Sequence, residues 1–267
     1  MELRHRERGD HGGIFDELNR VFESTFGELI PGILHDFASP LNGIIGRSEL
    51  LGRRVEKTLE RVAENGNTAD GDILEDCKKI HDDAGLLARE ANRLFDLFTR
   101  VGGKFRTLKD TAVQEINLSE LVEAEVAFLR FYPDVKHDIQ IQLILDREVP
   151  EVTGVRADYS VALSAIIKHS IDSMKDSESK ELVVITDYDD SHVSIKIEDT
   201  GTPAAEAQRK KVFEQCDPGT QTFDDLDGCR GLSQALLLLM RYDALLQIAH
   251  EAGVTVTSIR IPYEDRK

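Results

Sequence analysis

The sequence has no tryptophan, three cysteines and only 6% aromatic residues among 267. Its most apolar run, 235–240, is far shorter than the ~20 residues that span a bilayer. Residues 1–13 are polar and charged, unlike a signal peptide. We therefore expect a cytoplasmic protein with no membrane partner.

Basic charge is also scarce, because 33 lysines and arginines stand against 50 aspartates and glutamates, giving a net charge of −17. Nucleic-acid binding needs a concentrated basic surface, so no nucleic-acid partner is expected. Cys77, Cys216 and Cys229 lack metal-site spacing and are interpreted as free thiols in a reducing compartment. No metal site is predicted from them.

Residues 14–103 carry apolar side chains at the three- and four-residue spacing of amphipathic helices. Residues 64–71 have the composition of a turn, which predicts a hairpin of two long helices, the second ending at Gly102 and Gly103. One hairpin cannot bury both apolar stripes, so we expect a homodimer that forms a four-helix bundle. Residues 1–13 are expected to be a flexible N-terminus, and 104–116 a linker.

The pattern of residues 117–267 changes to short alternating helices and strands. A short helix ending near Phe213 and a Gly/Asp-rich loop are expected before the last helix. Together the elements predict an α+β fold, an α/β sandwich with one mostly antiparallel sheet and helices on one face. The other expected helices are 119–131, 157–174 and 232–241, and the expected strands are 139–145, 182–188, 193–198, 246–250 and 254–262.

The most informative segment surrounds His35. On a helix, His35 shares one face with Ser39, Asn42 and Gly46, and this stripe of small residues would leave room for another protein to reach the imidazole. Asp36 could orient the ring or accept its proton, leaving a neutral nitrogen as the nucleophile. An arbitrary His-Asp pair is more often an ordinary surface pair, here beside the helix bend expected at Pro40, so these residues alone leave both interpretations open.

This segment resembles the H-box of dimeric histidine kinases and related histidine phosphotransferases, in which His-Asp is followed by Pro-Leu inside a helical hairpin. The resemblance implies that His35 is the phospho-acceptor and that Asp36 assists phosphorylation. It places Ser39 where such kinases often carry Thr or Asn to position water for dephosphorylating a partner. Receiver domains of response regulators are the implied partners. A second pair, His81-Asp82, lacks the Pro-Leu and is interpreted as a surface pair.

The order of elements in 117–267 resembles the ATP-binding domain of the same kinases. The sequence Ile-Lys-Ile-Glu-Asp-Thr-Gly resembles the first glycine motif, which implies that Asp199, near Gly201, would accept the adenine amino group. A helix ending Lys-His-Ser-Ile-Asp-Ser-Met resembles the asparagine motif, and Val-Phe-Glu resembles the start of the ATP lid. Lys168 is a candidate phosphate ligand, and Gly231 survives from the second glycine motif.

The sequence departs from these kinase motifs at three places, all of which concern the binding of the metal ion and the phosphates. His169 stands where the resemblance implies an Mg²⁺-binding Asn, and imidazole is a poor Mg²⁺ ligand. Pro203 replaces a glycine of the first motif, and Asp227 and Cys229 disturb the second. We therefore expect a degenerate ATP site without a productively bound cofactor, with weak ATP or Mg²⁺ binding as an open alternative.

The leading hypothesis is a histidine phosphotransferase of a bacterial two-component phosphorelay, which exchanges a phosphoryl group between His35 and receiver domains. One alternative is an active soluble histidine kinase with a divergent ATP site. Another is a pseudokinase scaffold that binds response regulators without chemistry. Autophosphorylation with radiolabelled ATP separates the first two, and transfer of label from a phosphorylated regulator separates the third.

Overall fold

The computed structural model describes residues 11–65, 70–202 and 230–263. The chain forms two compact units, which we describe separately. One is Ile30–Gly103, and the other is Lys104–Lys267 together with Met1–Leu29. None of the described helices has the length and apolar character needed to cross a membrane.

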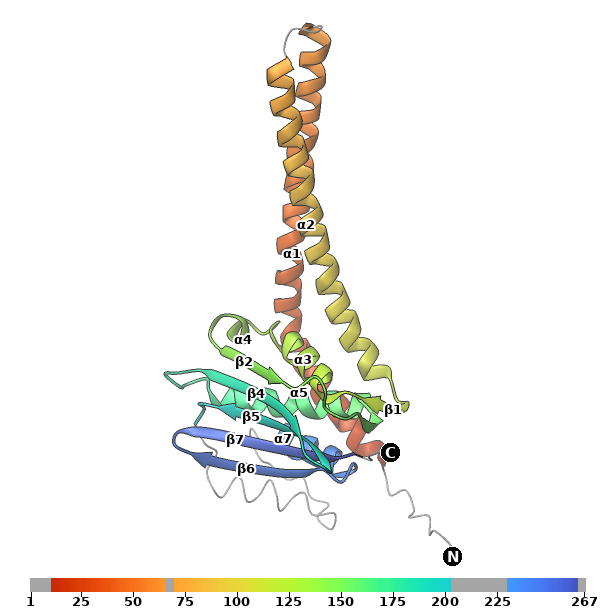
Figure 1. Cartoon of the computed structure of the whole chain (residues 1–267), viewed down its shortest axis with the longest axis vertical. Helices are drawn as coiled ribbons and strands as arrows, with labels where there is room; N and C mark the ends of the chain where they lie inside the picture. The colour runs from red at the N-terminus through yellow and green to blue at the C-terminus, as the bar shows by residue number, and fades with distance from the viewer. Residues whose placement is uncertain (1–10, 66–69, 203–229, 264–267) are drawn as a thin grey trace, which may run out of the picture. The chain divides into compact units, whose positions relative to one another are not determined.

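The expected helical hairpin is present, formed by α1 (His11–Asn65) and α2 (Asp70–Lys109) (Figure 1). The predicted end of the second helix at Gly103 is wrong, because α2 continues to Lys109 and the supposed linker is partly helical. The physical reason is burial: the side chain of Lys104, directly after the glycines, is enclosed and paired, which holds the next turn in helical form.

The second unit is an α/β sandwich, in agreement with the α+β fold expected from the sequence. Its main sheet has five strands in the order β2-β4-β5-β7-β6, in which only the β2–β4 pair is parallel. The elements expected from the sequence are α3 (Leu118–Leu129), β2 (Gln140–Leu145), α5 (Arg156–Ser173), β4 (Glu181–Tyr188), β5 (His192–Asp199), α7 (Arg230–Met240), β6 (Leu245–Glu251) and β7 (Val254–Pro262).

Three short elements were not expected: β1 (Val113–Ile116), α4 (Pro133–His137) and β3 (Val152–Val155). Strands β1 and β3 pair antiparallel as a separate two-stranded sheet. Each has only four residues, too few to show an apolar alternation in sequence. The expected helix ending near Phe213 and the loop 217–228 lie outside the described residues.

The core of this unit lies between one face of the main sheet and its helices. Alternate residues of the central strands, among them Leu182, Ile195 and Ile259, are fully buried. Helix α5 supplies Leu163 and Ile166 to the same core. The alternation of buried and open positions along β4 and β5 leaves the other sheet face more open, as the sequence pattern predicted.

Candidate functional site

Within the hairpin, α1 and α2 meet along an inner seam with heptad spacing. Ion pairs join the two helices across this seam, from Arg54 to Asp83 and from Arg61 to Asp76. At the edge of the seam, Phe37 stacks on Phe98, which stays largely exposed, with ring centroids 4.7 Å apart. The α1 residues of this seam are buried or half-buried at every position: Ile33, Phe37, Pro40, Ile44, Arg47, Leu51, Arg54, Thr58 and Arg61.

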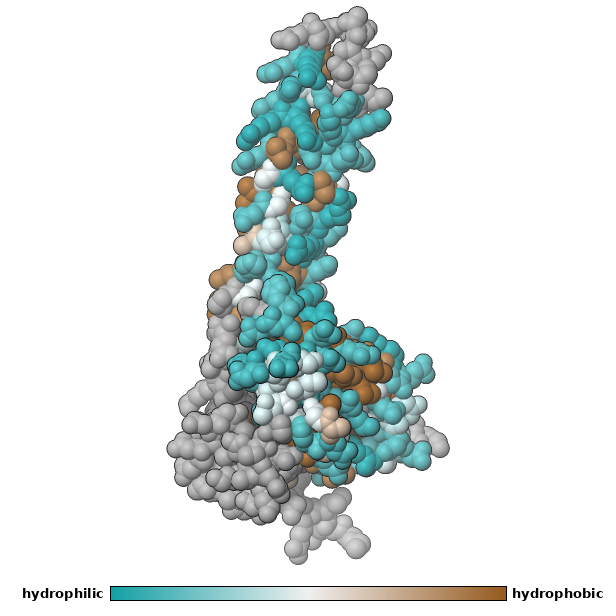
Figure 2. Space-filling view, turned by 90° about the vertical axis from the view of Figure 1, so that its left-hand side faces the viewer, coloured by the Kyte–Doolittle hydropathy of each residue, from teal (hydrophilic) through white to brown (hydrophobic). Residues whose placement is uncertain are grey.

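A second heptad seam lies one residue further along each helix and is exposed in the single chain. Its large apolar side chains include Leu34, Leu59 and Phe95, which are 61%, 64% and 70% exposed. Apolar side chains are visible among hydrophilic ones on the hairpin surface (Figure 2). We call this set the outer seam: Leu34, Ala38, Leu41, Ile45, Ser48, Gly52, Val55, Leu59 and Val62 on α1, and Cys77, His81, Ala84, Ala88, Ala91, Phe95, Phe98 and Gly102 on α2.

His35 lies on α1 outside both seams. Its side chain is 79% exposed, and Ser39, Asn42 and Gly46, which follow it along the same face, are exposed too. A Cβ added at Gly46 would meet nothing within 4 Å, so the surface beside the imidazole is open. The face predicted from the sequence is therefore present, and nothing in the hairpin covers it.

The nearest charged group to the imidazole is Asp36. Its Oδ1 lies 3.3 Å from Nδ1 of His35, and its side chain is only 15% exposed. A carboxylate beside Nδ1 favours the tautomer with the proton on that nitrogen. The lone pair then lies on Nε2, the ring nitrogen farther from the backbone, which is the atom suited to act as a nucleophile.

In the other unit, Asp199 and Gly201 meet at the end of β5. Oδ1 of Asp199 accepts from the Gly201 backbone N–H and from Ser173 Oγ, each at 3.0 Å. The Asp199 side chain is almost fully buried. A Cβ at Gly201 would lie 1.9 Å from Ser173 Oγ, so glycine is required there by close packing. These hydrogen bonds stabilise a turn at the end of β5, in which Oδ1 of Asp199 is the shared acceptor.

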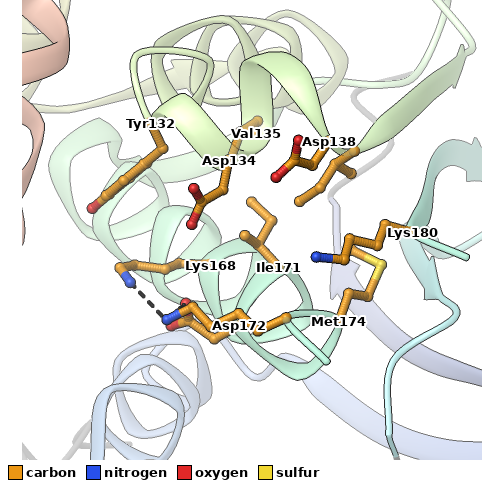
Figure 3. A pocket seen from close by; sticks show the side chains of 11 residues that line it. Tyr132, Asp134, Val135, Asp138, Lys168, Ile171, Asp172, Met174 and Lys180 are labelled. Carbon is orange, nitrogen blue, oxygen red and sulfur yellow. Dashed lines mark hydrogen bonds and ion pairs between the residues drawn. The ribbon is translucent and has the colours of Figure 1, made fainter. Parts of the chain in front are cut away.

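Lys168 lines a cavity of about 410 Å³ between α4 and the C-terminal half of α5 (Figure 3). Neither Asp199 nor Gly201 lines this cavity. Lys168 donates to Asp172 at 3.0 Å, and Lys175 pairs with the same carboxylate at 2.9 Å. Burial alone would raise the pKa of Asp172, but the hydrogen bonds from Lys175 and Lys168 outweigh it and lower the pKa.

His169, the residue in the Mg²⁺-ligand position, is half-buried on α5. Burial lowers the pKa of this imidazole, while the charges of Asp199 and Asp172 act in the opposite direction. Within the described part of the chain, no three His, Cys, Asp or Glu side chains converge as a metal site would require. Gly231 lies in the first turn of α7. The Pro203, Asp227 and Cys229 departures lie outside the described residues.

The structure also contains a buried polar cluster that was not predicted from the sequence. The Lys104 ammonium pairs with Glu125 of α3 and donates to Ser160 Oγ at 2.8 Å and to Ser164 Oγ at 3.0 Å. Both charged side chains are at most 4% exposed. Burial lowers the pKa of Lys104 more than the Glu125 carboxylate raises it. The available signal was Glu125 itself, which stands on the apolar face of its helix beside Leu121.

No protein-family model and no curated protein matches the sequence. Solved structures do match. The catalytic domain of ThkA aligns at 20% identity over 57% of this chain and 95% of its own, with a TM-score of 0.46. AdeS from Acinetobacter baumannii aligns at 15% identity over 86% of this chain and 98% of its own, with a TM-score of 0.44.

The mycobacterial sensor kinase MprB aligns at 17% identity over 57% of this chain and 97% of its own, with a TM-score of 0.42. All three are histidine kinases. This is the family that the sequence motifs resemble. At these identities and scores, the similarity concerns the path of the chain and assigns no activity to it.

Proposed function

We propose that this protein is a histidine phosphotransfer protein of a two-component phosphorelay, carrying a phosphoryl group on His35 and exchanging it with receiver domains of response regulators. The observation that carries the proposal is the imidazole of His35, open to solvent, oriented by Asp36 and outside both apolar seams. A phospho-accepting histidine must reach the active site of another protein, and this one is placed to do so.

The transfer follows from the tautomer that Asp36 favours. Nε2 of His35 attacks the phosphorus of an aspartyl phosphate on the receiver, forming an N–P bond while the P–O bond to the aspartate breaks and its carboxylate leaves. The Nδ1 proton stays on the ring, where Asp36 stabilises the positive charge that develops. The reverse reaction passes the group to a second receiver. Ser39, one turn along on the same exposed face, would hydrogen-bond a phosphoryl oxygen or a water.

The outer seam supports a homodimer. A heptad stripe in which exposed leucine, isoleucine, valine and phenylalanine alternate with small residues is costly in water, and a second copy of the same hairpin would cover it as a four-helix bundle. His35 lies to one side of that seam and stays accessible in such a bundle. His81 is itself an outer-seam residue, so dimerisation would enclose it. This difference favours His35 over His81 as the phospho-acceptor.

We further propose that the phosphoryl group comes from a regulator and not from ATP. The described residues do not fit Mg²⁺-ATP as the resemblance would require, since an imidazole stands at the metal position and Lys168 is paired with Asp172. One Asp199 oxygen already has two donors from the protein. The α/β unit would then serve to dock a receiver domain beside the hairpin.

A label-transfer experiment tests the proposal. A receiver domain phosphorylated with a ³²P-labelled small phosphodonor should pass label to the wild-type protein, and His35→Gln should abolish the transfer. His81→Gln is the matched control and should behave as wild type. Transfer that survives His35→Gln would refute the assignment of the site.

Incubation with γ-³²P-ATP and Mg²⁺ tests the source of the phosphate. No label should appear on the purified protein. Label that depends on His35 would instead identify an active kinase, and measurable receiver binding without any transfer would identify a scaffold.

A further inference from the structure

The cavity of about 410 Å³ lies within the α/β unit, apart from the residues that carry the proposed phosphotransfer. It is lined by the segment around α4, by the C-terminal half of α5 with the residues that follow it, and by Lys180 (Figure 3). Small-molecule sites in proteins have volumes of roughly 300–1,000 Å³, so this cavity has room for a small ligand. The chemistry of its lining indicates the class of that ligand.

Part of the lining is apolar. Val135, Ile171 and Met174 are buried, and all three belong to the hydrophobic core of the unit. Ile139 is half-buried and packs against the same core. A ligand with an apolar body would cover these side chains and gain the free energy of removing apolar surface from water.

Two carboxylates enter the cavity from α4. Asp134 lies in the first turn of this helix and Asp138 is the residue that caps its end, and both side chains point into the cavity (Figure 3). Neither carboxylate forms an ion pair or a side-chain hydrogen bond with any residue that the structure describes. The two negative charges are therefore available to a cation.

A lysine enters the same cavity from another element. Lys180 directly precedes β4, and its ammonium points into the cavity without an ion pair to any of the described residues (Figure 3). The other two lysines of the lining, Lys168 and Lys175, share the carboxylate of Asp172 at 3.0 Å and 2.9 Å. The aspartates of α4 and Lys180 thus face one cavity without pairing across it.

Unpaired charges of opposite sign in one cavity suit a ligand that carries both signs. An ammonium can bind Asp134 and Asp138 while a carboxylate of the same ligand binds Lys180, and each contact is a charge-assisted hydrogen bond. A space of 410 Å³ corresponds to a cube with an edge of roughly 7 Å, and an extended dipeptide also spans roughly 7 Å. A dipeptide therefore matches the size of the cavity as well as its charges.

We propose that this cavity binds a small zwitterion of the class of apolar dipeptides, with the ammonium at Asp134 and Asp138, the carboxylate at Lys180, and the side chains against the apolar part of the lining. The site would let the α/β unit respond to a small molecule. It rests on the cavity alone and does not depend on phosphotransfer at His35.

Isothermal titration calorimetry of the full-length protein with three peptides tests the proposal. Valyl-alanine carries both charges, N-acetyl-valyl-alanine lacks the ammonium, and valyl-alanine amide lacks the carboxylate. Valyl-alanine should bind saturably, and each capped peptide should bind about tenfold more weakly, because one charge-assisted contact is lost. His35→Gln protein should bind valyl-alanine as the wild type does, which separates this site from the proposed phosphotransfer.

Variants of the cavity connect each end of the peptide to its partner. Asp134→Asn/Asp138→Asn should weaken valyl-alanine about tenfold and leave the affinity for the acetylated peptide unchanged, since that peptide has no ammonium. Lys180→Gln should weaken valyl-alanine likewise and leave the affinity for the amide unchanged. These side chains form no bonds with the described residues, so circular dichroism should show that the variants keep their fold.

Asp190→Asn and Lys196→Gln are the matched controls, because both residues are exposed on the same unit and neither lines the cavity. They should bind all three peptides as the wild type does. The proposal would be overturned if valyl-alanine gave no saturable binding, or if the capped peptides bound as tightly as the free one. It would also fail if the cavity variants weakened free and capped peptides equally.

Discussion

The two units of this protein bury their apolar residues to different degrees. In the α/β unit, residues such as Leu163, Leu182 and Ile195 are completely enclosed by their own chain. In the unit Ile30–Gly103, the buried residues Ile33 and Leu97 are still 7% and 8% exposed, and a whole heptad seam lies open. The α/β unit encloses its core alone, whereas the hairpin leaves an apolar seam exposed, which a second copy would cover in the dimer that we propose.

This difference separates two kinds of role. A closed core tolerates change at the surface and loses stability when its interior is altered. An open helical pair would gain stability if a second copy covered its exposed seam, and the side chains outside that seam would stay exposed. His35 belongs to the second kind of surface.

The largest expected effect tests whether the hairpin needs a second copy. Ile45→Lys places a charge on the outer seam of each chain, and each isoleucine that is no longer buried costs roughly 1.5–3 kcal/mol. Each of the two chains loses one buried isoleucine, so the free energy of dimerisation should fall by about 3–6 kcal/mol. The variant should therefore sediment as a monomer in analytical ultracentrifugation. Glu60→Lys, on the face opposite both seams, is the control. If Ile45→Lys dimerised with an unchanged dissociation constant, the outer seam would not be the dimer interface, and the proposed contrast between an open hairpin and a closed α/β unit would fail.

A somewhat smaller effect is expected inside the closed unit. Lys104→Met leaves Glu125 buried without its cation, and breaking one half of such a pair costs about 3–5 kcal/mol. The double variant Lys104→Met/Glu125→Leu should recover much of this loss, because no lone charge remains. Urea unfolding followed by circular dichroism measures both. Equal losses in the single and double variants would show that the ion pair itself supplies the stability.

A pair of glycines sharpens the comparison further. In Gly154→Ala the new Cβ would lie 2.5 Å from the Tyr159 ring, which stacks on Tyr242, and the overpacking should destabilise the protein by about 1–3 kcal/mol. Gly46→Ala in the open hairpin should instead stabilise the helix by up to about 1 kcal/mol. Thermal unfolding midpoints should shift in opposite directions. Shifts of the same sign would contradict the difference in packing.

The smallest expected effect concerns pH. Because burial lowers the folded-state pKa of His169 below its ordinary value of 6.5, the unfolded chain binds a proton that the folded chain does not as the pH falls below 6.5. This contribution to stability is therefore complete above pH 6.5 and declines below it. His169→Gln should flatten the fall of the urea midpoint on mild acidification, with His137→Gln as a surface control. An unchanged slope would show that His169 is not protected from protonation.

Sequence reasoning located the hairpin, all five described strands of the main sheet and the open face around His35, because each is encoded by local periodicity. It failed for features that depend on contacts between residues far apart in the sequence. The end of α2 was placed at Gly103 because glycine usually stops a helix, but Lys104 finds its partners on α3 and α5, far along the chain. The sequence pattern also did not distinguish Ile44, which is half-buried in the inner seam, from Ile45, which is exposed in the outer one.

The sequence by itself determined the amphipathic hairpin, the α/β class of the second unit and the histidine with small neighbours, since these depend on spacing along a single helix or strand. Only the tertiary structure decided which apolar face each helix buries and which it leaves open. It also decided that Lys168 lines a cavity to which Asp199 does not contribute, and that Lys104, near the end of α2, is buried and paired with Glu125. These features depend on pairs of residues brought together by folding, and no local pattern encodes such a pair.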